Sequence, residues 1–385
     1  MKSFVFLCLL ISVKIQAQTD LTTHFYADIK RGIDLLYSEQ KKVTGCIDGL
    51  DCAETAPKEI LIQNAIQFKN QFDQTLKKYT LSGFSTEKVN FNLTKFKFNS
   101  PLQKADSLSN TVYGYIYRPN LPYHCEGNFK FPGTLFIHHV ADKIDDEQMF
   151  ANLAAQMHKG VIMLIYLPEY GPRKKIKTDL PFANDIFEFK NQLLQSILDI
   201  HIAGEILKAD PLVSKNNLQL AGLSLGAMVT AISAGIDPLF DKYLIGLGGG
   251  DLASIMTSDK SKHGGEIKSA LSNISWNTDY ARYNLSSLDA ITWAYTVKNK
   301  KIMILNAQND ELIDHEKSFL KLLNAYKQNN TVETKIYDSS HVPDHHTLGL
   351  KKALGIYVSI LSSIVNFFGD SQSALINQCQ NQYTN

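Results

Sequence analysis

The sequence predicts an α/β domain with a mostly parallel central sheet that is covered by helices on both faces. From about residue 133 onward, unbroken apolar runs of strand length alternate with longer segments of helical periodicity. A parallel strand is buried on both faces, and the crossover to the next parallel strand usually contains a helix, so this alternation is typical of a parallel sheet. The chain of 385 residues is long enough for one large domain or two ordinary ones.

The strands are expected in two groups. In residues 89–98 and 111–117, apolar side chains occur at about every second position, which indicates antiparallel opening strands. The later apolar runs predict the remaining strands, over residues 133–139, 161–167, 218–221, 242–247, 301–305 and 334–337. Helices are expected between and after them, over residues 148–158, 184–207, 227–234 and 353–368.

Residues 1–18 are typical of a secretory signal peptide. Lys2 supplies a positive charge, residues 4–13 form an apolar core, and residues 15–18 include a small residue, as expected near a cleavage site. The apolar core is too short to span a bilayer comfortably. We therefore expect a secreted or periplasmic protein, with an uncleaved membrane anchor as the alternative.

Two regions are expected after the signal peptide. Residues 19–87 contain two segments with apolar side chains at helical spacing, which we interpret as a helical N-terminal extension that packs beside the main domain or covers its active site. Residues 88–385 form the main domain. Within it, residues 251–295 lack a clear strand, so they are a candidate cap insertion after the sixth strand.

After removal of the signal peptide the chain holds four cysteines, an even number that permits two disulfides. Cys46 and Cys52 close a short loop of turn-forming residues, which makes them the favoured pair. Cys125 and Cys379 are paired by elimination. Free, buried thiols remain the alternative.

The charge balance excludes one class of partner. Lys and Arg number 39 and Asp and Glu number 38, and a net charge of +1 gives no reason to expect a nucleic acid. No spacing of cysteine and histidine indicates a zinc site, and no motif indicates a cofactor. The sequence does not indicate membrane contact or an oligomeric state.

The sharpest local signal is the segment Gly222-Leu223-Ser224-Leu225-Gly226, which has the form G-x-S-x-G. A serine on a sharp strand-to-helix turn has strained backbone angles, and a glycine two positions away on each side relieves the crowding. An apolar strand precedes the segment and a helix rich in small residues follows it, as the motif requires. Ser224 is therefore the candidate nucleophile, with a structural Gly-Ser turn as the alternative.

A serine nucleophile needs a base, and the base needs an acid that orients it. Asp310 lies in the loop after the strand at residues 301–305, at the strand end where open α/β sheets form their sites. Asp314 and Glu311 are the alternatives for this acid.

The candidate base is His341, which directly follows the strand at residues 334–337. His345 and His346 compete with it, although they are better placed to open the last helix. A metal site made by these three histidines is a further alternative, but no obvious carboxylate spacing beyond Asp344 supports it.

Two backbone N–H groups are expected to bind the oxyanion that forms in such a reaction. Leu225 supplies the first, because it follows the nucleophile and opens a helix. The second is expected after the strand at residues 133–139, where Val140 is the first choice and His139 the second. A glycine-rich run at residues 246–250 either permits close backbone approach to the site or forms a flexible loop.

Together these residues resemble the α/β-hydrolase superfamily, in its dienelactone-hydrolase-like and acyl-esterase-like branches, over about residues 88–370. Residues 222–226 resemble the nucleophile elbow, residues 309–313 the acid loop, and His341 the final histidine of that family. Residues 135–139 resemble the strand before a His-Gly oxyanion turn, but His139 stands where the family usually has glycine.

The expected activity is the hydrolysis of carboxylic esters of small molecules or lipids through Ser224, His341 and Asp310, by way of an acyl-enzyme. A serine peptidase on the same fold is one alternative. A catalytically inactive binding protein, suggested by His139, is another. Four aromatic residues either line an acyl pocket or serve as ordinary packing: Trp276, Tyr280, Tyr283 and Trp293.

Overall fold

The structure is a computed structural model of the chain, and it describes residues 23–38, 44–45, 54–55, 58–105, 107–122, 127, 129–140, 144–174, 186–256, 278–341 and 350–382. Residues 1–18, Cys46, Cys52 and Cys125 lie outside these ranges, so the signal peptide and both disulfides stay predictions. Cys379 lies within them and is buried.

The main sheet has nine strands in the order β11-β10-β9-β8-β6-β7-β5-β4-β3. The strands from β6 to β11 pair in parallel, whereas β3, β4 and β5 are antiparallel to their neighbours. This confirms the predicted fold class, including the antiparallel opening strands. Their bounds are β3 Ser85–Lys88, β4 Leu93–Asn99, β5 Thr111–Tyr117, β6 Phe131–Ile137, β7 Val161–Ile165, β8 Val213–Leu223, β9 Lys242–Gly246, β10 Lys301–Ala307 and β11 Thr331–Tyr337.

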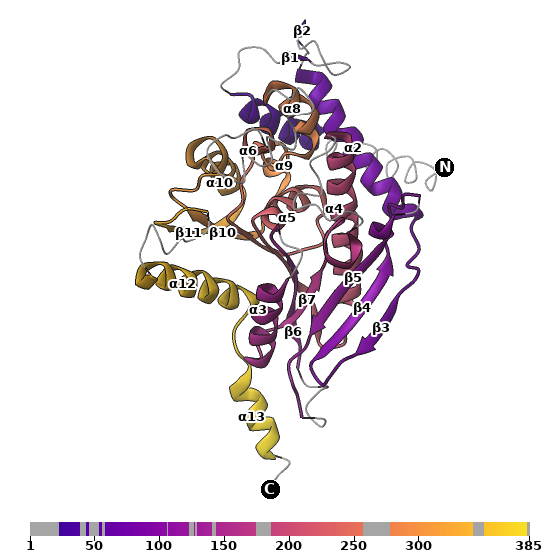
Figure 1. Ribbon diagram of the computed structural model, residues 1–385, viewed down its shortest axis with the longest axis vertical. Helices are drawn as coiled ribbons and strands as arrows, with labels where there is room; N and C mark the ends of the chain where they lie inside the picture. Colours follow the sequence, from indigo (N-terminus) through magenta and orange to yellow (C-terminus); the bar gives the residue numbers. More distant parts are fainter. Residues whose placement is uncertain are drawn as a thin grey trace, which may run out of the picture.

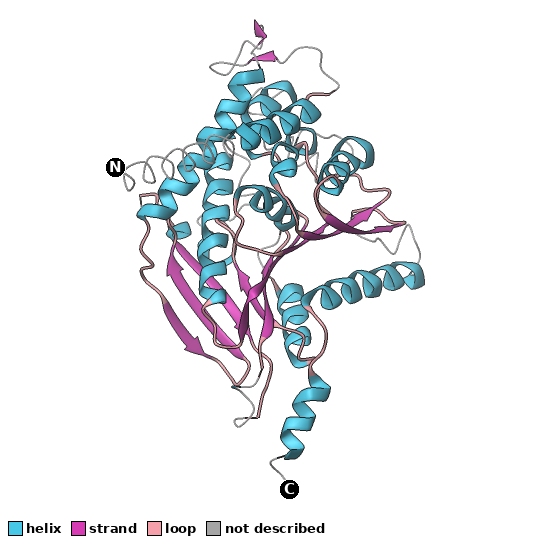
Figure 2. Ribbon diagram, turned by 180° about the vertical axis from the view of Figure 1, so that it is seen from behind, coloured by secondary structure: helices cyan, strands magenta, loops and turns pink. Residues whose placement is uncertain are grey.

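Helices cover both faces of the sheet (Figures 1 and 2). Helices α3 (Asp145–Gln156) and α12 (Leu350–Phe368) pack on one face, against β7 and β6. Helices α4 (Ile186–Lys208) and α5 (Leu225–Ile236) pack on the other, where α5 contacts β8 and β9. The central strands are therefore closed to water on both sides, and every residue of β7 is buried.

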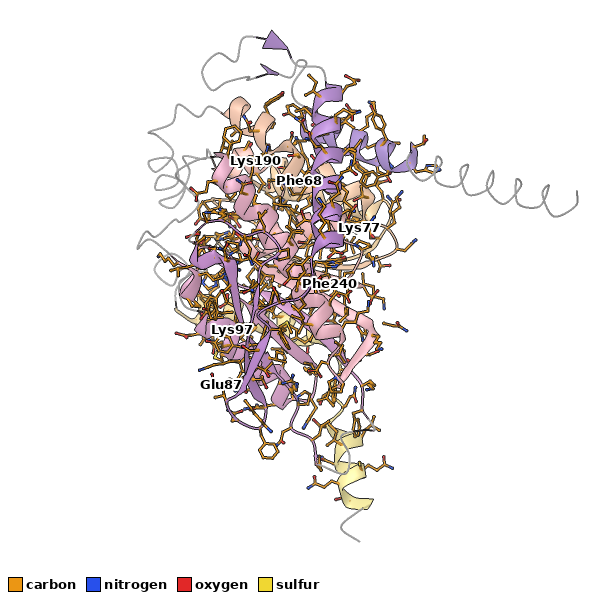
Figure 3. The ribbon with its side chains drawn as sticks, turned by 90° about the vertical axis from the view of Figure 1, so that its right-hand side faces the viewer. Phe68, Lys77, Glu87, Lys97, Lys190 and Phe240 are labelled. Carbon is orange, nitrogen blue, oxygen red and sulfur yellow. The ribbon has the colours of Figure 1, made fainter. Side chains whose placement is uncertain are left out.

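The two edge strands of the sheet differ in exposure: β3 is exposed throughout, and β11 only in part. Figure 3 shows Glu87 on β3 and Lys97 on the neighbouring β4, where both side chains are exposed. Phe240 lies in the interior and is fully buried. At the other end, β11 is an edge strand with alternating partial exposure. Beyond α12, helix α13 (Ser373–Gln382) extends from the body toward the C-terminus (Figure 1).

The predicted N-terminal extension is helical in two stretches, residues 23–36 and α2 (Lys58–Lys78). Helix α2 packs on α4 and on the short helix η4 (Ser286–Leu288). The first helix approaches the main domain closely at Gly32, where a β-carbon would lie 2.2 Å from the carbonyl oxygen of Thr292. The extension therefore lies beside the main domain. Between the two helices, β1 (Thr44–Gly45) and β2 (Glu54–Thr55) pair with each other.

The segment predicted as an insertion is helical where the structure describes it. It contains α6 (Leu252–Met256), α8 (Thr278–Leu285) and η4, and α9 (Ala290–Trp293) continues into η5 (Ala294–Thr296). The buried carboxylate of Asp289 accepts hydrogen bonds from the N–H groups of Asp251, Leu252 and Ile291. Burial, together with the nearby carboxylate of Asp251, raises the pKa of Asp289 to about 6. Asp289 therefore ties both ends of the segment together, while the cap itself stays a prediction.

The remaining short elements are η1 (Leu108–Asn110), η3 (Gly171–Arg173), the π-helix η6 (His315–Leu320) and α10 (Lys321–Lys327). Within the described ranges no single helix is both long and apolar enough to cross a membrane, and residues 351–368 and 373–381 meet that criterion only as a pair bent by 55°.

Candidate active site

Ser224 lies at the sharp turn between β8 and α5, with φ of 51° and ψ of −113°. This conformation is rare for a residue with a side chain, and it costs free energy on the order of 1–3 kcal/mol. The two flanking glycines are required by close contacts. A β-carbon at Gly222 would lie 2.2 Å from the carbonyl oxygen of Gly226, and one at Gly226 would lie 2.4 Å from that of Ile137.

The hydroxyl of Ser224 faces His341. The distance from Ser224 Oγ to His341 Nε2 is 3.0 Å, and the Ser224 N–H donates to the carbonyl of Gly246 on β9 at 2.8 Å. The serine is thus fixed from two directions, by the neighbouring strand and by the histidine.

Asp310 lies in the loop after β10, and its side chain is fully buried. Its Oδ1 accepts hydrogen bonds from the N–H groups of Leu312 and Ile313, at 2.9 and 2.8 Å. Its Oδ2 lies 2.8 Å from Nδ1 of His341. The carboxylate can only accept, so Nδ1 carries the proton and Nε2 turns its lone pair toward Ser224.

The two alternative acids have other partners. Glu311 Oε2 accepts the backbone N–H of His341 at 3.0 Å, so this side chain holds the loop that carries the histidine. Asp314 caps the π-helix by accepting the N–H groups of Glu316 and Lys317. Among the three carboxylates, Asp310 is therefore the one bonded to the imidazole ring.

His345, His346 and Asp344 lie outside the described residues. Within the part of the chain that the structure describes, no group of three histidine, cysteine or carboxylate side chains could hold a metal ion.

The second part of the site is the turn after β6, residues 138–140, which we call the β6 turn. It lies beside the start of α5, because a β-carbon at Gly226 would also lie 2.6 Å from the carbonyl oxygen of His138. The N–H of His139 is occupied, since it donates to Glu147 Oε1 at 3.1 Å. The N–H groups of Val140 and Leu225 make no hydrogen bond to another described residue. This favours Val140 over His139 as the free donor of the turn.

His138 supports the β6 turn, and the charge of Arg173 acts on the His138 ring. The fully buried ring of His138 accepts the N–H of Leu167 at Nε2, and its Nδ1 lies 2.5 Å from the carbonyl of His139. Burial lowers the pKa of His138 to about 4. Arg173 donates to the carbonyl of Tyr166 and to Asp199, in an ion pair whose two side chains are fully buried.

The glycine-rich run at residues 246–250 is a packed junction. A β-carbon at Gly248 would lie 2.6 Å from the Ala227 β-carbon on α5, and one at Gly249 would lie 2.2 Å from Ser318 Oγ. The run therefore packs closely against both α5, which follows the nucleophile, and η6, which follows the acid loop.

Of the four candidate pocket aromatics, the structure describes the side chains of two. Trp293 is fully buried, donates from Nε1 to the carbonyl of Ser287 and packs against Phe25, so it is ordinary packing. Tyr283 is partly buried against the core. Trp276 and the side chain of Tyr280 lie outside the described part of the structure.

Sequence reasoning placed His138 at the end of the strand before the oxyanion turn, but it missed the positions of Glu147 and Arg173. The sequence carries little signal for them. Glu147 follows Asp145 and Asp146 at a helix start, a pattern that usually indicates exposed acids that stabilise the helix dipole. Only the fold shows that the third acid of this run points inward.

No protein-family model matches the sequence, and a search among curated proteins finds no relative. Several solved structures have a fold similar to that of this chain. Acetyl xylan esterase 1 from Thermoanaerobacterium sp. JW/SL YS485 matches with a TM-score of 0.55 and 11% identity, over 87% of this chain and 98% of that one. The acetyl xylan esterase from Paenibacillus sp. R4 matches with a TM-score of 0.52 and 14% identity, over 86% and 98%.

The acylaminoacyl peptidase of Pyrococcus horikoshii matches with a TM-score of 0.51 and 15% identity, over 78% of this chain and 44% of that one. At these identities the likeness is one of fold. With the strand order, it confirms that this chain has the α/β-hydrolase fold.

Proposed function

We propose that this chain is a serine hydrolase that cleaves carboxylic ester bonds, with Ser224 as nucleophile, His341 as base and Asp310 as the orienting acid. The observation that carries the proposal is the hydrogen-bond path from Ser224 Oγ through His341 to the buried carboxylate of Asp310, with steps of 3.0 and 2.8 Å. A serine hydroxyl is a weak nucleophile until a base accepts its proton, and this path supplies one.

In the proposed reaction, Ser224 Oγ attacks the carbonyl carbon of the ester while His341 Nε2 takes the hydroxyl proton. The same imidazolium then protonates the departing alkoxide, which leaves an acyl-enzyme. Water attacks the acyl group with His341 again as the base, and the carboxylic acid leaves as Ser224 regains its proton. Asp310 keeps the proton on Nδ1 throughout and stabilises the charged ring.

The oxyanion of each tetrahedral intermediate would be bound by the N–H groups of Leu225 and Val140. Support comes from their location on either side of Ser224 and from the occupied N–H of His139. Loss of one such donor typically costs about 2.7–4 kcal/mol in the transition state.

Ester hydrolysis is favoured over peptide hydrolysis by the extent of the structural likeness. Both acetyl xylan esterases are matched over 98% of their length, but the acylaminoacyl peptidase over only 44%. The proposed substrate is an ester of a small molecule or a lipid.

The test is turnover of p-nitrophenyl esters of increasing chain length by the wild type and by Ser224→Ala. The variant should lose about 10⁴-fold or more in kcat and retain its circular dichroism spectrum. A fluorophosphonate probe should label only the wild type. Equal labelling of both proteins would contradict the assignment of Ser224, and a folded wild type that neither reacts nor turns over ester would favour an inactive binding protein. Turnover of amides without esters would favour the peptidase.

The proposal also includes export. Residues 1–18 would be removed, and the mature chain would hold the pairs Cys46–Cys52 and Cys125–Cys379, as an oxidising compartment allows. N-terminal sequencing should place the mature end near residue 19, and peptide mapping without reduction should recover both pairs. Four alkylatable thiols in the native protein would contradict the pairing.

A further inference from the structure

The β6 turn is held by a fully buried carboxylate that the proposed reaction does not use. Glu147 lies in the first turn of α3, and its side chain is 0% exposed. Its Oε1 accepts two hydrogen bonds from one residue, from the backbone N–H of His139 at 3.1 Å and from Nδ1 of its ring at 2.5 Å. A buried carboxylate is costly unless it is paired and hydrogen-bonded, so both contacts are needed to keep Glu147 in place.

The two members of the pair keep each other charged. Burial alone would raise the pKa of Glu147, but the hydrogen bonds from His139 hold it below its ordinary value. The hydrogen bond to Glu147 in turn raises the pKa of the His139 ring, and the charge of Asp146 acts in the same direction. Within the described residues, the titratable groups that face this ring are Glu147 and Asp146 on α3 and the neutral His138 within the turn.

The pair lies at the end of β6, next to the strand that leads to Ser224. The register pairs Ile137 of β6 with Gly222 of β8, so the residues that follow in both strands continue side by side toward Ser224. A glycine at position 139 would leave this turn without a side-chain anchor, whereas His139 supplies two donors to a rigid helix. The next residue along the chain is Val140, whose N–H is the proposed oxyanion donor.

We propose that Glu147 and His139 form a positioning pair that fixes the β6 turn so that the N–H of Val140 faces the reacting oxygen. This inference rests on the proposed function for its effect on catalysis, but the restraint on the turn is independent of it. His139 and Glu147 act through the backbone of Val140 and touch no substrate. An oxyanion donor is effective only when it is held in place before the reaction, because it then needs no reorganisation in the transition state.

The first test measures the turn itself by amide hydrogen exchange, in the wild type, Glu147→Ala and Glu147→Gln. The matched control is Asp145→Ala, which removes an exposed acid of the same helix turn that does not act on the His139 ring. Glu147→Ala should raise the exchange rate of the His139 N–H about 10-fold or more, because this amide loses its acceptor and local opening no longer breaks two hydrogen bonds. Unchanged exchange in Glu147→Ala would overturn the proposal.

The second test separates kcat from KM. Glu147→Gln keeps an acceptor oxygen and the shape of the side chain, which protects folding, but it removes the charge that holds the ring. A misplaced donor should lower kcat about 10- to 100-fold with KM changed less than about 3-fold. Asp145→Ala should retain the kcat of the wild type. A Glu147→Gln enzyme with normal kcat, or one changed only in KM, would count against the pair.

A pH profile gives a readout that a merely structural role would not alter. The wild-type kcat should fall on the alkaline side as the ring of His139 loses its proton, and in Glu147→Gln this fall should begin at lower pH. If the wild type hydrolyses no ester, the proposed function fails, while hydrogen exchange still decides on the positioning pair. If the wild type is active and Glu147→Ala has normal exchange, only the pair is wrong.

Discussion

On one side of Ser224, the loops after β10 and β11 are joined by carboxylates that accept backbone N–H groups, as Asp310 does within its own loop and Glu311 does across to His341. On the other side, the β6 turn is held by side chains that titrate, two histidines and a buried glutamate. The first side is a network of carboxylates that accept hydrogen bonds from backbone N–H groups and from the His341 ring. The second depends on the proton of His139. The loops on the two sides of Ser224 should therefore respond differently to a change in pH.

The largest expected effect is on the acid side. Asp310→Asn replaces the acceptor of the His341 Nδ1–H by an amide that can force the other tautomer, which removes the lone pair that faces Ser224. We expect kcat for p-nitrophenyl esters to fall about 10⁴-fold. The control Asp314→Asn keeps a helix-capping oxygen and should lie within about threefold of the wild type. A loss of similar size in both variants would show that the acid has been misassigned.

The next effect concerns the buried ion pair of Arg173 and Asp199, whose arginine acts electrostatically on His138 of the β6 turn. Asp199→Asn leaves Arg173 buried without its counter-charge, and breaking a fully buried ion pair typically costs about 3–5 kcal/mol. Urea unfolding should show that loss. The exposed pair Lys352–Asp338 provides the contrast, and Asp338→Asn should leave the unfolding midpoint unchanged. If Asp199→Asn unfolds at the wild-type urea concentration, the ion pair does not stabilise this side.

Glu311→Ala should have a smaller effect, because Glu311 acts only through the backbone of His341. We expect kcat to fall about 10-fold with little change in KM, since the misplaced base is needed only in the chemical steps. Glu316→Ala, an exposed acid in the same segment, is the control. Glu311→Asp should restore part of the loss, and a Glu311→Ala enzyme with full kcat would remove Glu311 from the site.

The smallest effect is a difference in stability with pH. The raised pKa of His139 stabilises the folded chain fully below the ordinary histidine pKa of about 6.5, and this stabilisation is lost as the pH rises through the folded value. The lowered pKa of Glu147 stabilises it above the ordinary glutamate pKa of about 4.3 and is lost as the pH falls through the folded value. The stability difference between wild type and His139→Asn should therefore be greatest between about pH 4.5 and 6.5. A difference that grows from pH 7 to 9 would contradict this.

The sequence was sufficient for the fold class and for the residues that the structure brings together at Ser224. Apolar runs mark buried parallel strands because both faces of such strands are covered, and the ends of β8, β10 and β11 carry Ser224, Asp310 and His341 to one edge. The role of Glu311 was not predictable, because its contact with His341 joins two loops that no local pattern relates.

The other side of the site was harder to predict for a physical reason. His139 was predicted as the second choice of oxyanion donor and as a departure from glycine. Its partner Glu147 was not found, since it lies on a helix whose inward face depends on how α3 packs against β7. Whether Trp293 lines a pocket or serves as ordinary packing was likewise undecidable from sequence, because an aromatic residue in a core and one in a pocket have the same local pattern.

The backbone of Ser224 has a consequence for heat resistance. Its φ of 51° belongs to a region that glycine adopts easily, so Ser224→Gly would relieve a cost that the native chain carries at every temperature. The greater freedom of glycine in the unfolded chain offsets part of that gain. Ser224→Ala keeps the β-carbon and therefore the strain. Ser224→Gly and Ser224→Ala should therefore both be inactive but melt at different temperatures. The serine that makes the proposed reaction possible would thus lower the thermal stability of the native chain.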